Sequence, residues 1–342
     1  MRKEWLLAFL CISMGVSGQE KVDYTPELHG TLRGKYEYQT TEGAGRFQVR
    51  TARISVQGKV ARRVEYKAEV DLCDEGVIKM LDAYTRLHPW KDVQFTIGQM
   101  RAPFTIDAHR SPHLQYFANR SFIAKQVGNV RDVGAMIGYT MHVGFPVRLQ
   151  AGLFNGSGLT GQKNFWTKGI NYSAKVQAFL PFNLNLEASV QKIKPDDYTV
   201  MMYDVGLTYH YNHFLAEAEY LYKTYARNAF PNVHAVDVFA NYDIPLKNRK
   251  ALVKMVSPLV RYDFMSDHSD GVRYVDGVRN ETGALMINDY QRHRLTGGVT
   301  LRLATPFVSD IRINYEKYFY RAGATPRISE RDKIVVEVMT RF

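Results

Sequence analysis

The chain has 342 residues, 45 lysines and arginines against 34 aspartates and glutamates, and a formal net charge of +11. Its mean hydropathy is −0.30. No run of about 20 apolar residues is present, which excludes a helical membrane protein. Aromatic residues make up 13 % of the sequence and exclude low-complexity disorder. The length fits roughly two soluble domains or one large barrel.

The N-terminus has the layout of a secretory signal peptide. Arg2 and Lys3 precede the apolar run 6–12, and small residues follow up to Gly18. We expect a signal peptide at 1–18, with a short buried element or a lipoprotein signal at Cys11 as alternatives. Only Cys73 remains in 19–342, so the exported chain is expected to fold without an intrachain disulfide.

From residue 28 onward, charged and apolar residues alternate with period two. In the stretch 63–72, charged residues at odd positions alternate with mostly apolar residues at even positions. Successive side chains of a strand point to opposite faces, so each segment has one charged face and one apolar face. The segments are longer than ordinary strands, and their apolar faces carry tyrosine and phenylalanine near the ends. This pattern is typical of an outer-membrane barrel, in which apolar residues face lipid and polar residues face water.

The alternating segments predict sixteen strands, at 29–40, 45–59, 62–73, 77–88, 92–101, 131–143, 147–155, 167–180, 183–194, 199–211, 214–225, 232–243, 251–265, 288–303, 308–320 and 332–342. An even number suits a bacterial single-chain barrel. Tight turns such as 245–248 alternate with longer connections such as 266–287. The last strand ends in Phe342, and a terminal aromatic residue looks like the sorting signal of outer-membrane barrels. The predicted fold class is an all-β transmembrane antiparallel barrel, with 19–342 as one domain.

Residues 102–130 interrupt this alternation between the fifth and sixth strands. The segment mixes charged residues with apolar ones such as Phe104 and Phe122. A connection of this length within a compact domain is usually functional. We expect a constriction loop folded into the lumen, and a surface loop is the alternative.

An ordered series of motifs surrounds this segment. The series is Gly98-Gln99-Met100-Arg101-Ala102-Pro103-Phe104, Asn119-Arg120-Ser121, Arg131-Asp132-Val133-Gly134-Ala135 and Ala151-Gly152-Leu153-Phe154-Asn155-Gly156-Ser157-Gly158. It resembles the phosphate-selective porin O and P family of outer-membrane channels. The resemblance implies a sixteen-stranded porin, typically a homotrimer, with a loop that constricts the pore and with no cofactor.

A channel selects ions through the charge along its hydrated path. We expect the anion-binding constriction to be formed by Arg101, Arg110, Arg120 and Lys125. We expect the lumen wall to include Arg33, Lys35, Arg50, Arg63, Arg292 and Arg294. Arginine binds oxyanions such as phosphate through two parallel hydrogen bonds. The alternative for each wall arginine is a pair with an inward carboxylate that stiffens the lumen.

The leading functional hypothesis is an outer-membrane porin for small solutes that prefers anions. A barrel enzyme of the lipase or protease type and a structural or adhesive barrel with a plugged lumen are the alternatives. The spacing of His109 and His113 binds metal only on a helix, which the sequence does not predict there, so we expect no metal. The expected partners are outer-membrane lipids, small anionic solutes and two further copies of the chain. Nucleic acid is not expected, because the chain is exported and its basic residues are interleaved with acidic ones.

Overall fold

The computed structural model describes residues 22–74, 76–126, 130–196, 198–248, 251–275, 278–280, 282–303 and 308–342, without the side chains of residues 125, 126 and 279. The predicted signal peptide at 1–18 lies outside the described residues. All long elements are strands, joined in one antiparallel sheet.

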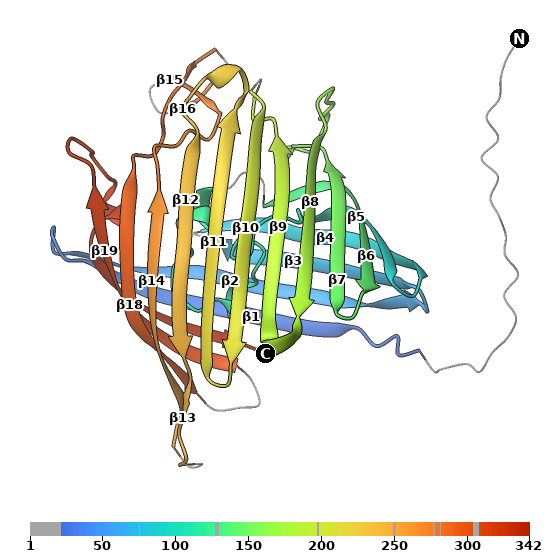
Figure 1. Cartoon of the computed structure of the whole chain (residues 1–342), viewed down its shortest axis with the longest axis horizontal. Coiled ribbons are helices and arrows are strands. Elements are labelled where there is room, and N and C mark those ends of the chain that lie inside the picture. Colours follow the sequence, from blue (N-terminus) through green and yellow to red (C-terminus); the bar gives the residue numbers. More distant parts are fainter. Residues whose placement is uncertain are drawn as a thin grey trace, which may run out of the picture.

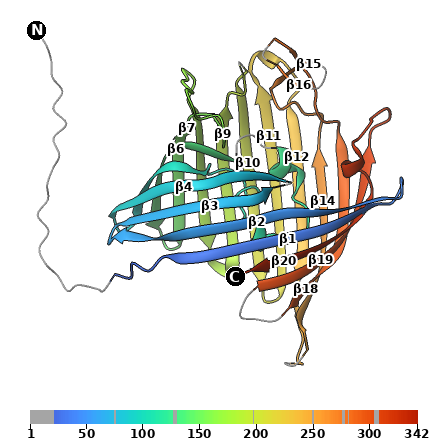
Figure 2. The same ribbon diagram turned by 180° about the vertical axis from the view of Figure 1, so that it is seen from behind.

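Sixteen long strands close into a barrel (Figure 1). They are β1 (Glu27–Gln39), β2 (Ala44–Ala61), β3 (Val64–Asp74), β4 (Val77–Trp90), β5 (Val93–Arg101), β6 (Arg131–His142), β7 (Pro146–Phe154), β8 (Asn171–Leu180), β9 (Leu184–Ile193), β10 (Val200–Tyr211), β11 (Phe214–Tyr225), β12 (Val233–Tyr242), β14 (Val253–Met265), β18 (Arg292–Leu303), β19 (Val308–Tyr320) and β20 (Lys333–Arg341). Each strand pairs with its neighbours in the sequence, and β1 pairs with both β2 and β20 (Figure 2). The predicted sixteen-stranded antiparallel barrel is therefore confirmed.

The remaining elements are short. They are β13 (Ile244–Pro245), β15 (Arg273–Val275), β16 (Val278–Arg279), β17 (Ala284–Leu285), α1 (Phe122–Gln126) and the 3₁₀ turns Pro112–Leu114, Pro181–Asn183, Ala226–Asn228 and Ile328–Glu330. In the described ranges, no helix has both the length and the apolarity needed to cross a membrane.

Two connections differ from the prediction. Ile244 and Pro245 pair with Val256 and Met255, so a hairpin continues past the tight turn expected at 245–248 (Figure 1). Within the connection expected at 266–287, β15, β16 and β17 form a small separate sheet. The strands expected from 167 and 288 begin at Asn171 and Arg292.

The strands bury their polar faces and expose their apolar faces. In β1, Arg33, Lys35 and Glu37 are buried, whereas Leu32 is 51 % exposed and Tyr38 is 38 % exposed. A soluble barrel has the opposite arrangement, because water favours polar groups on the outside. The exposed apolar faces therefore fit contact with lipid, as expected for a transmembrane barrel.

The barrel closes where the first and last strands meet. Gly30 N donates to Phe342 O at 2.7 Å, and Phe342 N donates to Gly30 O at 3.1 Å. The Phe342 ring lies over Gly30, and a Cβ atom at this position would clash with the ring. Glycine at position 30 therefore lets the Phe342 ring pack directly on the backbone of β1.

Candidate functional site

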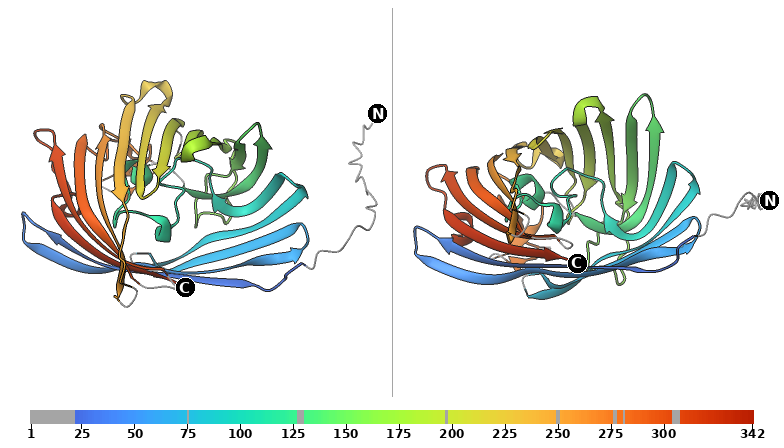
Figure 3. Two further views of the ribbon diagram at one scale, coloured as in Figure 1. Left: turned by 60° about the horizontal axis from the view of Figure 1, so that its bottom comes forward. Right: turned by 90° about the horizontal axis from the view of Figure 1, so that it is seen from below.

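The segment between β5 and β6, described at 102–126 and 130, lies against the polar faces of the strands. Arg33 Nη2 on β1 donates to Ala118 O at 2.9 Å, and Ser173 Oγ on β8 donates to Pro103 O at 2.8 Å. Ala118 N donates to Asn314 Oδ1 on β19 at 2.8 Å. Figure 3 shows this segment within the ring of strands. We call residues 102–126 the inner segment.

Asp107 organises the inner segment. Its Oδ2 accepts hydrogen bonds from the backbone N and the Oγ of Ser121, each at 3.0 Å. Its backbone carbonyl accepts from Arg120 Nη1. Burial favours the protonated acid, but Arg120, Arg110, Arg261 and the Ser121 N–H outweigh burial and lower the pKa of Asp107. This carboxylate is therefore ionised and joins the two ends of the segment.

Arg110 is neutralised by carboxylates. Its Nη2 donates to Glu217 Oε2 on β11 at 2.5 Å, and its Nη1 lies 3.4 Å from Asp107 Oδ1. Its guanidinium carbon lies 5.1 Å from the centre of the Tyr116 ring. Burial alone would lower the pKa of Arg110, but Glu217 and Asp107 raise it above its ordinary value. The geometry makes Arg110 an anchor of the inner segment to β11.

Arg101 and Arg120 instead contact mainly backbone carbonyls. Arg101 Nη1 donates to His109 O at 2.5 Å, and Arg120 Nη2 donates to Arg110 O at 2.8 Å. Asp107 Oδ1 lies 4.0 Å from Arg120, and among the described residues no carboxylate lies within 4.0 Å of Arg101. Burial lowers the pKa of Arg120 to about 10, so the side chain is charged at neutral pH. These two residues bring positive charge to the inner segment that close carboxylates do not neutralise.

The side chain of Lys125, the fourth residue predicted for the constriction, lies outside the described atoms. Its backbone belongs to α1. The predicted role of Lys125 stays a prediction.

Among the predicted wall residues, Arg33, Lys35 and Arg294 form buried ion pairs. Arg33 Nε donates to Glu337 at 2.9 Å, and Lys35 Nζ lies 2.8 Å from Glu37. Arg294 Nη2 lies 2.9 Å from Asp263. The pairs of Arg33 and Arg294 join neighbouring strands, and both arginines also donate to backbone carbonyls of the inner segment.

The other three predicted wall residues occupy different positions, with Arg50 within β2, Arg292 at the start of β18 and Arg63 outside the strands. Arg50 pairs with Asp74 at 2.6 Å. Arg292 Nη1 lies 3.2 Å from Asp289, and its guanidinium carbon lies 4.6 Å from the Phe122 ring centre. Arg63 lies in the turn between β2 and β3, where it is exposed and donates to Pro89 O at 2.7 Å.

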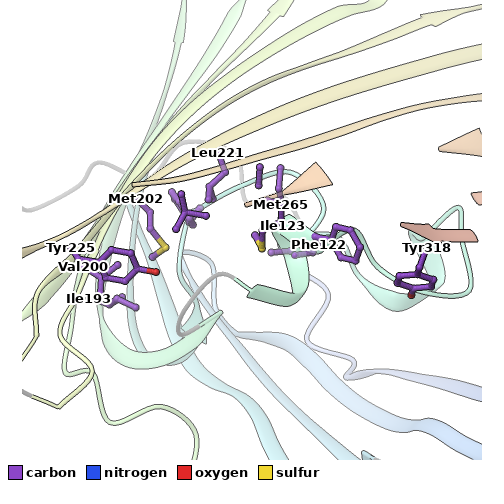
Figure 4. Close-up of a cluster of buried hydrophobic side chains, with 14 residues drawn as sticks. Phe122, Ile123, Ile193, Val200, Met202, Leu221, Tyr225, Met265 and Tyr318 are labelled. Atoms are coloured by element: carbon purple, nitrogen blue, oxygen red, sulfur yellow. The ribbon is translucent and has the colours of Figure 1, made fainter. Parts of the chain in front are cut away.

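The strand residues of a hydrophobic cluster on the inner wall were not predicted from the sequence (Figure 4). Phe122 and Ile123 of α1 pack with inward-facing Met202, Leu221 and Met265 from β10, β11 and β14. The sequence carries a signal for this cluster, because apolar residues occupy the ends of the otherwise polar faces of these strands. The cluster fixes α1 to the wall by excluding water from apolar surface.

A group of paired charges lies on β2, β3, β4 and β6. Arg131 Nε donates to Asp82 at 2.7 Å, and Lys67 Nζ lies 2.9 Å from Glu69 and 3.0 Å from Asp82. The side chains of Lys67 and Arg53 are 22 % and 16 % exposed, which is more than those of the carboxylates beneath the inner segment. Water therefore reaches this side of the interior more readily.

A metal site is not evident. Across the part of the chain that the structure describes, no group of three or more histidine, cysteine, aspartate or glutamate side chains is arranged to hold a metal ion.

Solved outer-membrane proteins share this architecture at low sequence identity. The anion-selective porin from Comamonas acidovorans has a TM-score of 0.61 and 11 % identity, with 93 % of this chain and 99 % of that chain covered. OmpF from Salmonella typhi, solved with daunomycin, has a TM-score of 0.61 and 12 % identity over 93 % and 98 % of the two chains. A loop-deletion mutant of OmpT, an outer membrane protein of Vibrio cholerae, has a TM-score of 0.60 and 13 % identity over 93 % and 98 %. These likenesses confirm the fold.

The sequence comparisons identify the family. A search among curated proteins gave no match. Residues 23–197, just over half of the chain, match the family described as phosphate-selective porin O and P. Together with the closed barrel and its polar inner face, this match shows that the chain belongs to the phosphate-selective porin O and P family and is a porin.

Proposed function

We propose that the chain forms a water-filled channel in the bacterial outer membrane for passive diffusion of small solutes, with a preference for anions. The observation that carries this proposal is the inverted barrel, whose charged side chains face inward and whose apolar side chains face outward. Such a wall encloses a hydrated path while its outer face contacts lipid.

The inner segment acts as the constriction. It covers the inner face of β10, β11, β12 and β14, where Glu219 and Asp263 accept hydrogen bonds from its backbone. The partly exposed charges of β2 and β3, including Arg53 and Lys67, lie on the remaining wall. The open path therefore runs between the inner segment and this wall.

Anion preference comes from positive charge beside that path. Arg101 and Arg120 have no carboxylate closer than the 4.0 Å contact of Arg120 with Asp107, among the described residues. The family description and the anion-selective neighbour from Comamonas acidovorans support the same preference. Because arginine binds carboxylates and phosphates bidentately, we expect oxyanions among the solutes.

Planar-bilayer recordings test this function. We expect stepwise currents in salt solution and a reversal potential in a chloride gradient that indicates anion preference. A reversal potential that indicates cation preference would reject the anion assignment. A chain that refolds but gives no steps would favour the plugged barrel, and turnover of lipid or peptide substrates would favour an enzyme.

Two further features belong to the same proposal. Export requires the predicted signal peptide at 1–18, and N-terminal sequencing of the protein from outer membranes tests the cleavage site. A homotrimer is expected from the family resemblance, and crosslinking in native membranes tests this state. A monomer alone after crosslinking would contradict the homotrimer.

A further inference from the structure

Four carboxylates form a row on the inner wall beneath the inner segment. Glu219 on β11 lies opposite Asp237 on β12, and Asp237 lies opposite Asp263 on β14. Asp204 on β10 is the diagonal neighbour of Glu219, and the two side chains are within hydrogen-bonding reach. Like charges placed opposite each other on adjacent strands repel. We call these four residues the carboxylate row.

The carboxylate row is buried from solvent. Its side chains are between 0 % and 2 % exposed. Asp204 Oδ2, Glu219 Oε2 and Asp237 Oδ1 are buried without a hydrogen-bond partner. A buried carboxylate that lacks partners is costly, and a neutral acid is favoured in its place.

Among the described residues, basic side chains approach within 4.0 Å only at the Asp237 and Asp263 end of the row. Asp263 lies 2.9 Å from Arg261 Nε and 2.9 Å from Arg294 Nη2, and Asp237 lies 3.7 Å from Arg261 Nε. Among the described residues, no lysine, arginine or histidine lies within 4.0 Å of Asp204 or Glu219. The Asp204–Glu219 end is therefore the most difficult part to ionise fully.

Other charged groups do not remove this imbalance. The groups that face the row are Lys175 on β8, Glu187 on β9, Glu217 on β11, Arg261 on β14, Arg294 on β18, and Asp107, Arg110 and Arg120 of the inner segment. Lys175 pairs with Glu187, and Arg110 pairs with Glu217 and Asp107. Lys175 and Arg110 are therefore already matched by carboxylates outside the row, and Arg261 and Arg294 contact its Asp263 end.

We propose that the carboxylate row is a proton-binding site, in which Asp204 and Glu219 share one proton at neutral pH. The protonated acid donates its O–H to a free oxygen of its neighbour, so one carboxylate charge is removed and an orphaned acceptor gains a partner. Pairs of close carboxylates hold a proton for the same reason, since both cannot ionise in a dry site.

The proton also controls how the inner segment is held. Glu219 Oε1 accepts a hydrogen bond from Ile106 N at 2.5 Å, and Asp263 Oδ1 accepts one from Phe122 N at 3.2 Å. Loss of the proton at alkaline pH adds a negative charge beneath Asp107 and weakens docking through repulsion. This consequence rests on the proposed role of the inner segment as the constriction.

Infrared spectroscopy of the refolded wild-type chain tests the proton directly. We expect a band from a protonated carboxyl group at neutral pH that shifts in D₂O and is lost at alkaline pH. The band is expected to be absent in Glu219→Gln. A wild-type spectrum without this band at neutral pH, or a band that persists in both Glu219→Gln and Asp204→Asn, would overturn the proposal. The wild-type spectrum alone decides the matter if the variants do not fold.

Channel recordings test the consequence, from about pH 6 to about pH 10, which includes the range known for buried carboxyl groups. We expect wild-type conductance to increase at alkaline pH. Glu219→Gln removes this response, because its amide keeps a donor and an acceptor but loses no proton. Glu65→Gln is the matched control, since Glu65 on β3 is 33 % exposed and outside the row. Equal pH responses in wild type and Glu219→Gln would overturn the proton site, whereas the absence of channels at every pH would overturn the proposed function.

Discussion

The guanidinium of Arg294, on strand β18, donates a hydrogen bond of 2.7 Å to the backbone carbonyl of Arg120 in the inner segment. The wall arginine is itself held by Asp263, with its Nε 3.0 Å from Asp263 Oδ2. Arg261 adds a second donor, from Nη1 to Asn119 O at 3.1 Å. Wall arginines therefore fix the backbone next to Arg120, whose own side chain is partly buried and donates mainly to backbone carbonyls.

The difference between arginines paired with carboxylates and arginines that contact backbone carbonyls predicts which of them determine ion preference. Because Arg101 and Arg120 lack close carboxylates, replacing both by glutamine is expected to lower the anion/cation permeability ratio by about fivefold, the effect of about 1 kcal/mol of lost attraction. Reversal potentials in planar bilayers measure this ratio.

The matched control is Arg110→Gln combined with Glu217→Gln. This pair removes one positive and one negative charge that lie 2.5 Å apart, so the net charge is unchanged. We expect the permeability ratio of this control to stay near that of the wild type. A larger loss of selectivity in the control than in the Arg101/Arg120 variant would contradict the assignment.

The hydrophobic cluster predicts a docking role for Phe122. Its ring is buried and lies 4.6 Å from the guanidinium carbons of both Arg292 and Arg294. Phe122→Ala is expected to weaken docking of α1 by about 3 to 5 kcal/mol, the usual result of a large cavity. We expect higher and noisier single-channel conductance, while Leu114→Ala, at a 58 % exposed site, is the control. Wild-type conductance in Phe122→Ala would show that the cluster does not hold the constriction.

Replacing Asp107 is expected to make the inner segment more sensitive to trypsin. Asp107→Asn keeps an acceptor for Ser121 but removes the charge beside Arg110 and Arg120, which is expected to cost about 1 to 3 kcal/mol of docking free energy. Trypsin is then expected to cut after Arg110 or Arg120 faster than in the wild type. Equal cleavage rates would show that Asp107 does not hold the segment closed.

The surroundings of His113 predict a specific pH dependence of the stability of the folded chain. Burial and the neighbouring Arg341 lower the pKa of His113 from 6.5 to about 4. Between these values the unfolded chain binds a proton at this position and the folded chain does not, so native stability falls as pH decreases from 6.5 towards 4. Histidine NMR of the refolded protein measures this pKa. A value near 6.5 for His113 would contradict the half-buried contact with Arg341.

Much of the barrel could be predicted from the sequence, because period-two alternation is local and continues along each strand. In β20, the residues from Lys333 to Arg341 alternate as the prediction requires. The starts of β8 and β18 were less accurate, because both strands were expected to begin before Asn171 and Arg292. The first residue of a strand is determined by where its hydrogen bonds to the neighbouring strands begin, and this depends on those strands as well as on the local sequence.

The site was less predictable. The sequence indicated the inner segment and its arginines, but the pair of Arg110 with Glu217 joins residues that lie 107 positions apart. Nothing in the local pattern distinguishes this neutralised arginine from Arg120, because the difference depends on the fold. The helix α1 has only five residues, too few for a helical period to be visible.

Spin labels on the two faces of the barrel test the central claim most directly. In a Cys73→Ser background, labels are placed at Leu32→Cys on the outer face and Lys67→Cys on the inner face of refolded protein in lipid vesicles. The account predicts that oxygen dissolved in lipid relaxes the label at position 32, whereas a water-soluble nickel chelate relaxes the label at position 67. Relaxation of both labels by the same agent, or the opposite assignment, would contradict a barrel with lipid outside and water within.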